Sequence, residues 1–98
     1  MPYCYILHSS SIDTYYIGAC QGELETRLLA HNEKKYGNKA YTSRAHDWEV
    51  YLSIETDDFA HAIRIERKIK VMKSRKYIKN LKQYSELRAK IWRETRLT

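Results

Sequence analysis

A chain of 98 residues with 43% hydrophobic and 31% charged side chains has the size and composition of one globular domain, which excludes an intrinsically disordered chain. It contains no apolar run near the roughly 20 residues that span a bilayer, and no secretory signal at its N-terminus. Residues 64–98 carry 13 basic and 3 acidic side chains, a net charge of +10, whereas residues 1–63 carry 5 and 9. The basic half suggests a polyanion partner such as nucleic acid, although a solvated, lysine-rich helix surface explains the composition equally well.

Two runs rich in tyrosine and isoleucine open the chain and predict a hairpin. Tyr3–His8 is expected as one strand, Ser9–Asp13 as the turn and Thr14–Ala19 as the second strand. Cys4 and Cys20 are close enough in this hairpin to pair. Because they have neither a secretory signal nor the spacing of a zinc site, we expect free thiols in a cytoplasmic protein.

The middle of the chain predicts a helix, a loop and a third strand. Leu24, Leu28 and His31 recur at helical spacing, which favours a helix from about Gly22 to Tyr36. Residues 37–46 have no apolar period and are expected to form a loop. The segment after the loop alternates, and a strand there would place four apolar side chains on one side and Tyr51 on the other: Trp48, Val50, Leu52 and Ile54.

The remaining residues predict three helices. Asp57 or Asp58 is a good N-cap for the first, whose apolar stripe comprises Phe59, Ala62, Ile63, Ile69 and Met72. Ser74 is expected to begin a short helix toward Leu81, and Ser85 to cap a last one toward Arg96. The order ββαβααα predicts an α+β domain with a three-stranded antiparallel sheet.

Three polar residues suggest phosphate chemistry. Helical spacing extends the Phe59 stripe to Glu66, where a buried carboxylate needs a cation, although a stripe-edge glutamate paired with Arg67 or Lys70 is the simpler interpretation. Arg27 and His31 are four residues apart and therefore share a helix face. Together with Glu66 they would supply a phosphate-binding cation, a proton carrier and an oxygen ligand suited to Mg²⁺.

The order and spacing of these residues resemble the GIY-YIG endonucleases, over about residues 3–81. The hairpin carries Tyr3-Cys4-Tyr5 and Tyr16-Ile17-Gly18 at the positions of the two tripeptides that name the family, and the next helix carries Arg27-Leu-Leu-Ala-His31. The segment AHAIRIERKIKVMKSRKYIKNL resembles the region of the family's metal-binding glutamate and places it at Glu66. The chain is most similar to short stand-alone bacterial members, related to the N-terminal nuclease domain of the ABC excinuclease; further features shared with them are His31-Asn32, Tyr41–Arg44 and Trp48.

This resemblance implies a small DNA endonuclease that depends on Mg²⁺ or Mn²⁺ and hydrolyses phosphodiester bonds by a one-metal mechanism in DNA repair or recombination. It implies Glu66 as the metal ligand and Arg27 as the group that stabilises charge on the phosphate. We expect Tyr5, alone or together with His31, to be the general base and Tyr16 to orient the water. The alternative is a nucleic-acid-binding module of the same fold whose catalysis is weak or lost.

We expect the basic residues outside the site to contact DNA phosphates: Arg44, Lys68, Lys73, Arg75, Lys76 and Lys79. Asn80 either completes the site, as an asparagine often does in the family, or simply ends its helix. We divide the chain into a nuclease-like domain over residues 1–82 and a basic helical extension over residues 83–98. The sequence leaves the DNA substrate and the oligomeric state open.

Overall fold

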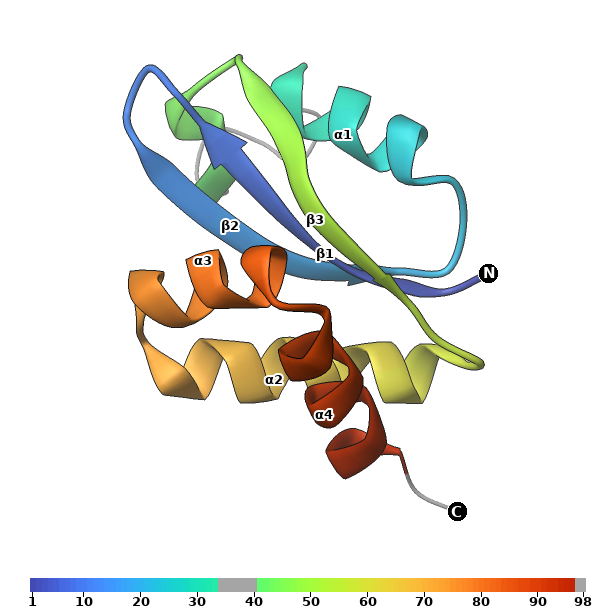
Figure 1. Ribbon diagram of the computed structural model, residues 1–98. Coiled ribbons are helices and arrows are strands. Elements are labelled where there is room, and N and C mark those ends of the chain that lie inside the picture. Colours follow the sequence, from blue (N-terminus) through green and yellow to red (C-terminus); the bar gives the residue numbers. More distant parts are fainter. Residues whose placement is uncertain (34–40, 97–98) are drawn as a thin grey trace.

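The computed structural model describes residues 1–33 and 41–96, which form a three-stranded sheet with helices on both faces (Figure 1). The strands have the order β2-β1-β3 and all pair antiparallel. The predicted α+β class and the order ββαβααα are confirmed. The elements are β1 (Tyr3–Ser9), β2 (Thr14–Cys20), α1 (Leu24–Asn32), a 3-10 helix (Tyr41–Arg44), β3 (Trp48–Glu55), α2 (Phe59–Met72), α3 (Arg75–Gln83) and α4 (Ser85–Thr95).

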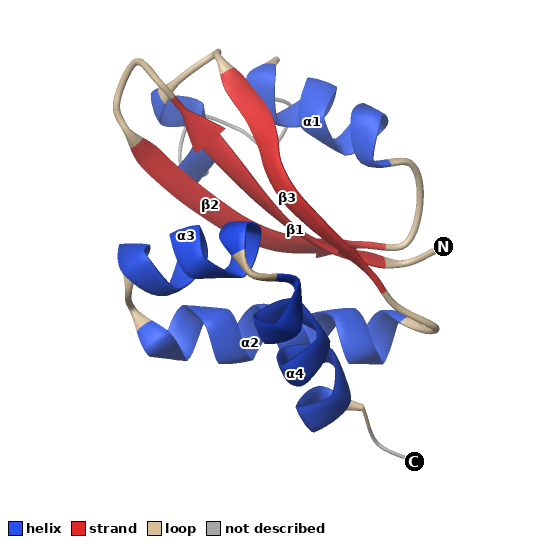
Figure 2. Ribbon diagram, in the orientation of Figure 1, coloured by secondary structure: helices blue, strands red, loops and turns tan. Residues whose placement is uncertain are grey.

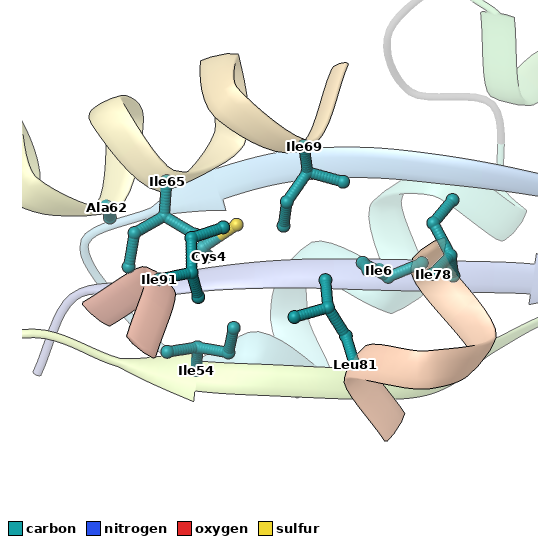
Figure 3. Packing of buried hydrophobic residues seen from close by; sticks show 9 residues of the cluster. All are labelled: Cys4, Ile6, Ile54, Ala62, Ile65, Ile69, Ile78, Leu81 and Ile91. Atoms are coloured by element: carbon teal, nitrogen blue, oxygen red, sulfur yellow. The ribbon is translucent and has the colours of Figure 1, made fainter. Parts of the chain in front are cut away.

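The sheet separates two clusters of buried side chains, with α1 on one face and α2, α3 and α4 on the other (Figure 2). The cluster under α2, α3 and α4 is aliphatic apart from one cysteine, and Figure 3 shows its members converging from the sheet and the three helices. We call it the aliphatic core: Cys4, Ile6, Ile54, Ala62, Ile65, Ile69, Ile78, Leu81 and Ile91. The smaller cluster on the α1 face comprises Tyr5, Leu7, Cys20, Ala45 and Trp48.

The hairpin forms as predicted, within one residue at each strand end. Tyr5 is paired with Gly18 and Leu7 with Tyr16, so strand alternation turns both tyrosines toward α1, while Tyr15 packs against the aliphatic core. The expectation of free thiols is also confirmed, since Cys4 and Cys20 are unpaired and belong to different clusters.

The predicted alternation of the third strand is wrong beyond its middle. The register between β1 and β3 shifts after Ile6, because Ile6 is paired with Leu52 whereas Leu7 is paired with Val50. One extra residue, Tyr51, therefore bulges from β3 and reverses the faces on its two sides. As a result Trp48 belongs to the cluster under α1 and Ile54 to the aliphatic core.

The predicted apolar stripe of α2 is rotated in the structure. Ile65 and Ile69 are buried with Ala62, whereas Met72 is 47% exposed and Ile63 is only partly buried. The helix turns this way because its opposite side also packs against α4. This rotation leaves Glu66 at the border of the buried stripe rather than in its centre.

The helix caps follow the predictions in two of three cases. Asp58 accepts a hydrogen bond from the His61 backbone, and Ser74 accepts one from the Tyr77 backbone. Ser85 is not a cap but the first residue of α4, whose N-cap is Tyr84. Helix α1 ends at Asn32 instead of Tyr36, and the predicted loop contains a 3-10 helix; residues 34–40 lie outside the described part of the chain.

Helix α4 is docked onto α2 by polar contacts. His61 Nε2 lies 3.0 Å from the Trp92 carbonyl oxygen and 3.0 Å from Thr95 Oγ1. Arg64 Nε donates to the Thr95 carbonyl oxygen at 2.7 Å, and Ile91 enters the aliphatic core. Within the described residues, every helix is too short or too polar to cross a lipid bilayer.

Candidate active site

A chain of hydrogen bonds lies buried between the sheet and α1. The Tyr5 hydroxyl is 3.1 Å from Nε2 of His31, and Nδ1 of the same ring is 2.7 Å from Oγ1 of Thr42 in the 3-10 helix. Tyr5 is 2% exposed, His31 4% and Thr42 2%. Buried polar groups are tolerated because each has a partner here. The arrangement fixes the imidazole from both sides and links three separate elements of the fold.

Gly18 has a steric reason for being a glycine. A Cβ at this position would lie 2.6 Å from the Tyr5 hydroxyl oxygen and 2.7 Å from Cζ of the same ring. It would also lie 3.1 Å from Cε2 of Tyr16. The glycine therefore makes the space that the Tyr5 phenol occupies over β2, and the tripeptide Tyr16-Ile17-Gly18 supplies both a phenol and a seat for the other phenol.

Tyr16 lies beside this chain but closer to solvent. Its ring centroid is 6.3 Å from that of Tyr5 and 4.9 Å from that of His31, and its side chain is partly exposed. The structure thus brings together Tyr5, Tyr16 and His31, which the sequence predicted from three separate motifs. Of the two phenols, Tyr16 is the one that water or a substrate reaches without a rearrangement of the core.

Arg27 lies at the other end of β2, near the edge of the sheet. Its Nη2 is 3.4 Å from the Ala19 carbonyl oxygen, and its side chain is partly exposed. It lines a cavity of about 510 Å³ whose walls come from the β2–α1 loop, α1 and the first residue of α2, Phe59. A guanidinium in such an opening can meet an anion from solvent.

The electrostatics keep His31 neutral. Burial, and then the positive charge of Arg27, lower the pKa of His31 from 6.5 to about 4. At neutral pH one ring nitrogen is therefore an acceptor and the other a donor. Either Tyr5 donates to Nε2 while Nδ1–H donates to Thr42, or both bonds run in the opposite direction. In both cases the imidazole has a proton-accepting nitrogen directed at a hydroxyl group.

Glu66 comes from the opposite face of the sheet. Its side chain is 19% exposed, and its Oε1 lies 3.8 Å from Nζ of Lys70, one helical turn further along. Burial and then the charge of Glu66 raise the pKa of Cys4 to about 12, which places the carboxylate near the α2 side of β1. Lys70 in turn lines a cavity of about 270 Å³ with Tyr16. The structure thus connects Glu66 to Tyr16 through Lys70, along the outer edge of β2.

These residues fit a singly ligated hard cation. The described residues contain no group of three or more His, Cys, Asp or Glu side chains that would hold a metal by themselves. Glu66 offers one carboxylate that is partly open to solvent and held only by a long ion pair with an exposed lysine. Such a ligand leaves most of the coordination shell to water and phosphate oxygens, the arrangement in which Mg²⁺ is often bound.

The other predicted residues lie away from the tyrosines. Lys68 is bound to Glu94 of α4 at 2.9 Å, and Arg75 to Asp13 at 2.9 Å. Asn80 is partly exposed in α3, and its side chain forms no hydrogen bond within the described part of the chain. The remaining three, Arg44, Lys76 and Lys79, are exposed.

Sequence reasoning missed Thr42 as a partner of His31. Thr42 is held in place by Trp48, whose Nε1 donates to the Thr42 carbonyl oxygen at 2.8 Å. Asn32 joins the end of α1 to the start of β3, since its amide accepts from Trp48 N at 2.8 Å and donates to Trp48 O at 3.0 Å. The segments containing these residues resemble the family, but their contacts span 6 to 16 residues and no local pattern reveals them.

Comparison with known families gives one result. A family model described as the GIY-YIG catalytic domain matches residues 1–84 of the 98-residue chain. The match contains the hairpin, α1, the 3-10 helix, β3, α2 and α3, and therefore every side chain of the site described above. Searches among curated proteins and among solved structures gave no significant match.

Proposed function

Because this chain belongs to the GIY-YIG family, whose catalytic domain implies nuclease activity, we propose that it is a Mg²⁺-dependent DNA endonuclease that hydrolyses phosphodiester bonds. The observation that carries the proposal is the buried chain of Tyr5, His31 and Thr42 beside the partly exposed phenol of Tyr16. A buried histidine and two tyrosines on one sheet face make a poor apolar core and a good proton-transfer site.

We propose that Tyr16, rather than Tyr5, touches the attacking water. Tyr5 is 2% exposed and its hydroxyl is engaged with His31, whereas Tyr16 is partly exposed. As a phenolate, Tyr16 accepts a proton from water while the water oxygen forms its bond to phosphorus and the bond to the leaving sugar oxygen breaks. Tyr5 and His31 then act as positioning residues that fix the Tyr16 ring. This division is the reverse of the one expected from the sequence, and the difference in exposure carries it.

Arg27 is proposed to bind the phosphate. The guanidinium opens into the cavity at the end of β2, and its positive charge already acts on His31. Its forked donors suit two phosphate oxygens and stabilise the extra negative charge of the transition state. The same charge favours the phenolate form of a neighbouring tyrosine.

Glu66 is proposed to be the only side-chain ligand of the metal. When bound, Mg²⁺ or Mn²⁺ supplies charge neutralisation for the phosphate and for the leaving oxygen. Lys70, which lies 3.8 Å from Glu66, orients the carboxylate toward the edge of β2. The site would then lie at this edge, between groups from the two faces of the sheet.

The cellular setting follows from chemistry that the structure allows. Cys4 and Cys20 are free buried thiols, which is usual in a reducing cytoplasm. We propose that the protein acts there on DNA in repair or recombination. Residues 1–82 would carry the nuclease activity and the basic extension over 83–98 would support it, since α4 packs on α2 and α3.

Cleavage assays with a Glu66→Gln variant test the proposal directly. Linear, nicked, flapped and branched DNA would be incubated with the full chain in Mg²⁺, in Mn²⁺ and in EDTA. Glu66→Gln keeps the side-chain size and removes the charge, so cleavage should be lost while DNA binding and the melting temperature are retained. Wild-type cleavage by this variant refutes the assignment, and DNA binding without cleavage by the wild type would favour a binding module.

The two tyrosines are separated by matched substitutions. Tyr16→Phe should slow cleavage by about 10²-fold or more with an unchanged melting temperature, as expected for a proton acceptor. Tyr5→Phe should slow it less and should also lower stability, because His31 loses a buried hydrogen-bond partner. Tyr3→Phe is the control and should be close to neutral in both. Equal turnover by wild type and Tyr16→Phe would contradict the proposed division.

A further inference from the structure

Two cavities adjoin along the outer edge of β2, beyond the tyrosines of the candidate site. The first, of about 270 Å³, is lined by Tyr15, Tyr16, Ile17 and Lys70. The second, of about 330 Å³, shares Tyr15, Ile17 and Lys70 with it and extends to the turn between α2 and α3, at Lys73, Ser74 and Arg75. Figure 1 shows this turn below the start of β2. We call the combined surface, from Tyr16 to Arg75, the β2–α3 groove.

The β2–α3 groove is lined by positive charge. Lys70 is 52% exposed at the point shared by both cavities. Lys73 is exposed, and its ammonium group forms no ion pair within the described residues. Arg75 is held by Asp13, with its guanidinium 5.1 Å above the ring of Tyr15. None of the described residues that line the two cavities is acidic, so the groove complements a polyanion.

Lys73 occupies a backbone position that favours glycine. It ends α2 in the left-handed conformation, with φ of 47° and ψ of 42°. Glycine adopts this conformation without the steric penalty that a Cβ incurs, and it is the usual residue at such helix ends. The fold therefore gains nothing from a lysine side chain at this position, and glycine can replace it as a clean test of the ammonium group.

We propose that the β2–α3 groove binds the DNA strand on one side of the scissile phosphate, with Lys70 and Lys73 contacting backbone phosphates. The inference rests on the proposed function for the identity of the polymer, and it adds the direction in which the strand leaves the site. Lys70 is the junction, because it contacts Glu66 and also lines both cavities. Contacts of this kind give affinity that depends on salt and not on base sequence.

The test is DNA binding without metal, measured as a salt series. A fluorescent duplex and its matching single strand would be titrated in EDTA with the full-length wild type, Lys70→Met, Lys73→Gly and the double variant. The charge-matched control is Lys90→Met, since Lys90 is an exposed residue of α4 that lines neither cavity. Melting temperatures would be measured in parallel, and that of Lys73→Gly should stay level or rise.

Each groove variant should weaken binding about threefold or more and reduce the slope of log affinity against log salt by about one unit, and the double variant by about two. Affinities and slopes equal to those of Lys90→Met would overturn the groove. The readout is independent of catalysis. If the wild type cuts no DNA but the groove variants still bind weakly, the proposed function fails and the groove stands. If cleavage requires Glu66 but the groove variants bind like wild type, only the groove fails.

Discussion

The two faces of the sheet bury different chemistry. Under α2, α3 and α4 lies the aliphatic core, in which isoleucine is the commonest residue. Under α1 lie a phenol, an imidazole and a hydroxyl joined by hydrogen bonds of 3.1 Å and 2.7 Å. Aliphatic side chains stabilise a fold through burial alone, whereas buried polar groups are costly unless every one has a partner. The comparison therefore assigns stability mainly to one face and chemistry to the other.

The largest expected effect lies in the aliphatic core. Ile65 is fully buried beneath β1 and β2, and Ile65→Ala should lower the free energy of unfolding by about 2–5 kcal/mol through lost burial and a residual cavity. Urea unfolding measures it. The control is Val71→Ala on the same helix, because Val71 is 76% exposed and its loss should cost no more than about 0.5 kcal/mol. Cleavage per folded molecule should be unchanged in both variants, and a selective loss of turnover in Ile65→Ala would break the comparison.

Acid should weaken the polar face next. The pKa of His31 is about 4 in the folded protein against 6.5 ordinarily, so the unfolded chain binds the proton more readily between these values. The stabilisation is fully present above pH 6.5 and is lost as the pH falls toward 4, by roughly 3 kcal/mol in total. Unfolding would be measured across this range for wild type and for His31→Gln. The difference between the two curves should slope, and a flat difference would show that His31 is not held neutral.

Gly18→Ala should come third and should affect both stability and rate. The added Cβ would lie 2.6 Å from the Tyr5 hydroxyl, and the buried ring has to move away from His31 to admit it. We expect a loss of about 1–3 kcal/mol in stability together with slower cleavage. Gly22→Ala is the matched control, because nothing lies within 4 Å of a Cβ there. Similar behaviour of the two variants would contradict the steric role of Gly18.

The smallest effect concerns Thr42, and it sharpens the comparison most. Thr42→Val keeps the shape but removes the hydroxyl that lies 2.7 Å from Nδ1 of His31, so it should cost about 1–2 kcal/mol and should alter the His31 tautomer. Nitrogen NMR of the imidazole reports that tautomer, and cleavage assays report its consequence. Thr42→Ser retains the hydroxyl and should restore both signals. An unchanged NMR spectrum in Thr42→Val would assign Thr42 to packing alone.

Much of this architecture was accessible from local sequence patterns. The tyrosine-rich hairpin, the order of elements and the free cysteines follow from alternation, spacing and the absence of a signal. The faces of Tyr5 and Tyr16 also follow, because side chains on a strand alternate whatever the rest of the chain does. The bulge at Tyr51 does not follow, since it depends on how β3 aligns with β1 and not on β3 itself.

By itself, the sequence determined the fold class, the family and the residues Tyr5, Tyr16, Arg27, His31 and Glu66, because these follow from order and spacing along the chain. Only the tertiary structure decided which phenol faces solvent, which hydroxyl holds the imidazole, and that Lys68 is bound to Glu94 while Lys73 lines a groove. The physical reason is that exposure, ion pairing and a buried pKa depend on the atoms that surround a side chain. Those atoms come from segments far apart in the sequence, and only packing brings them together.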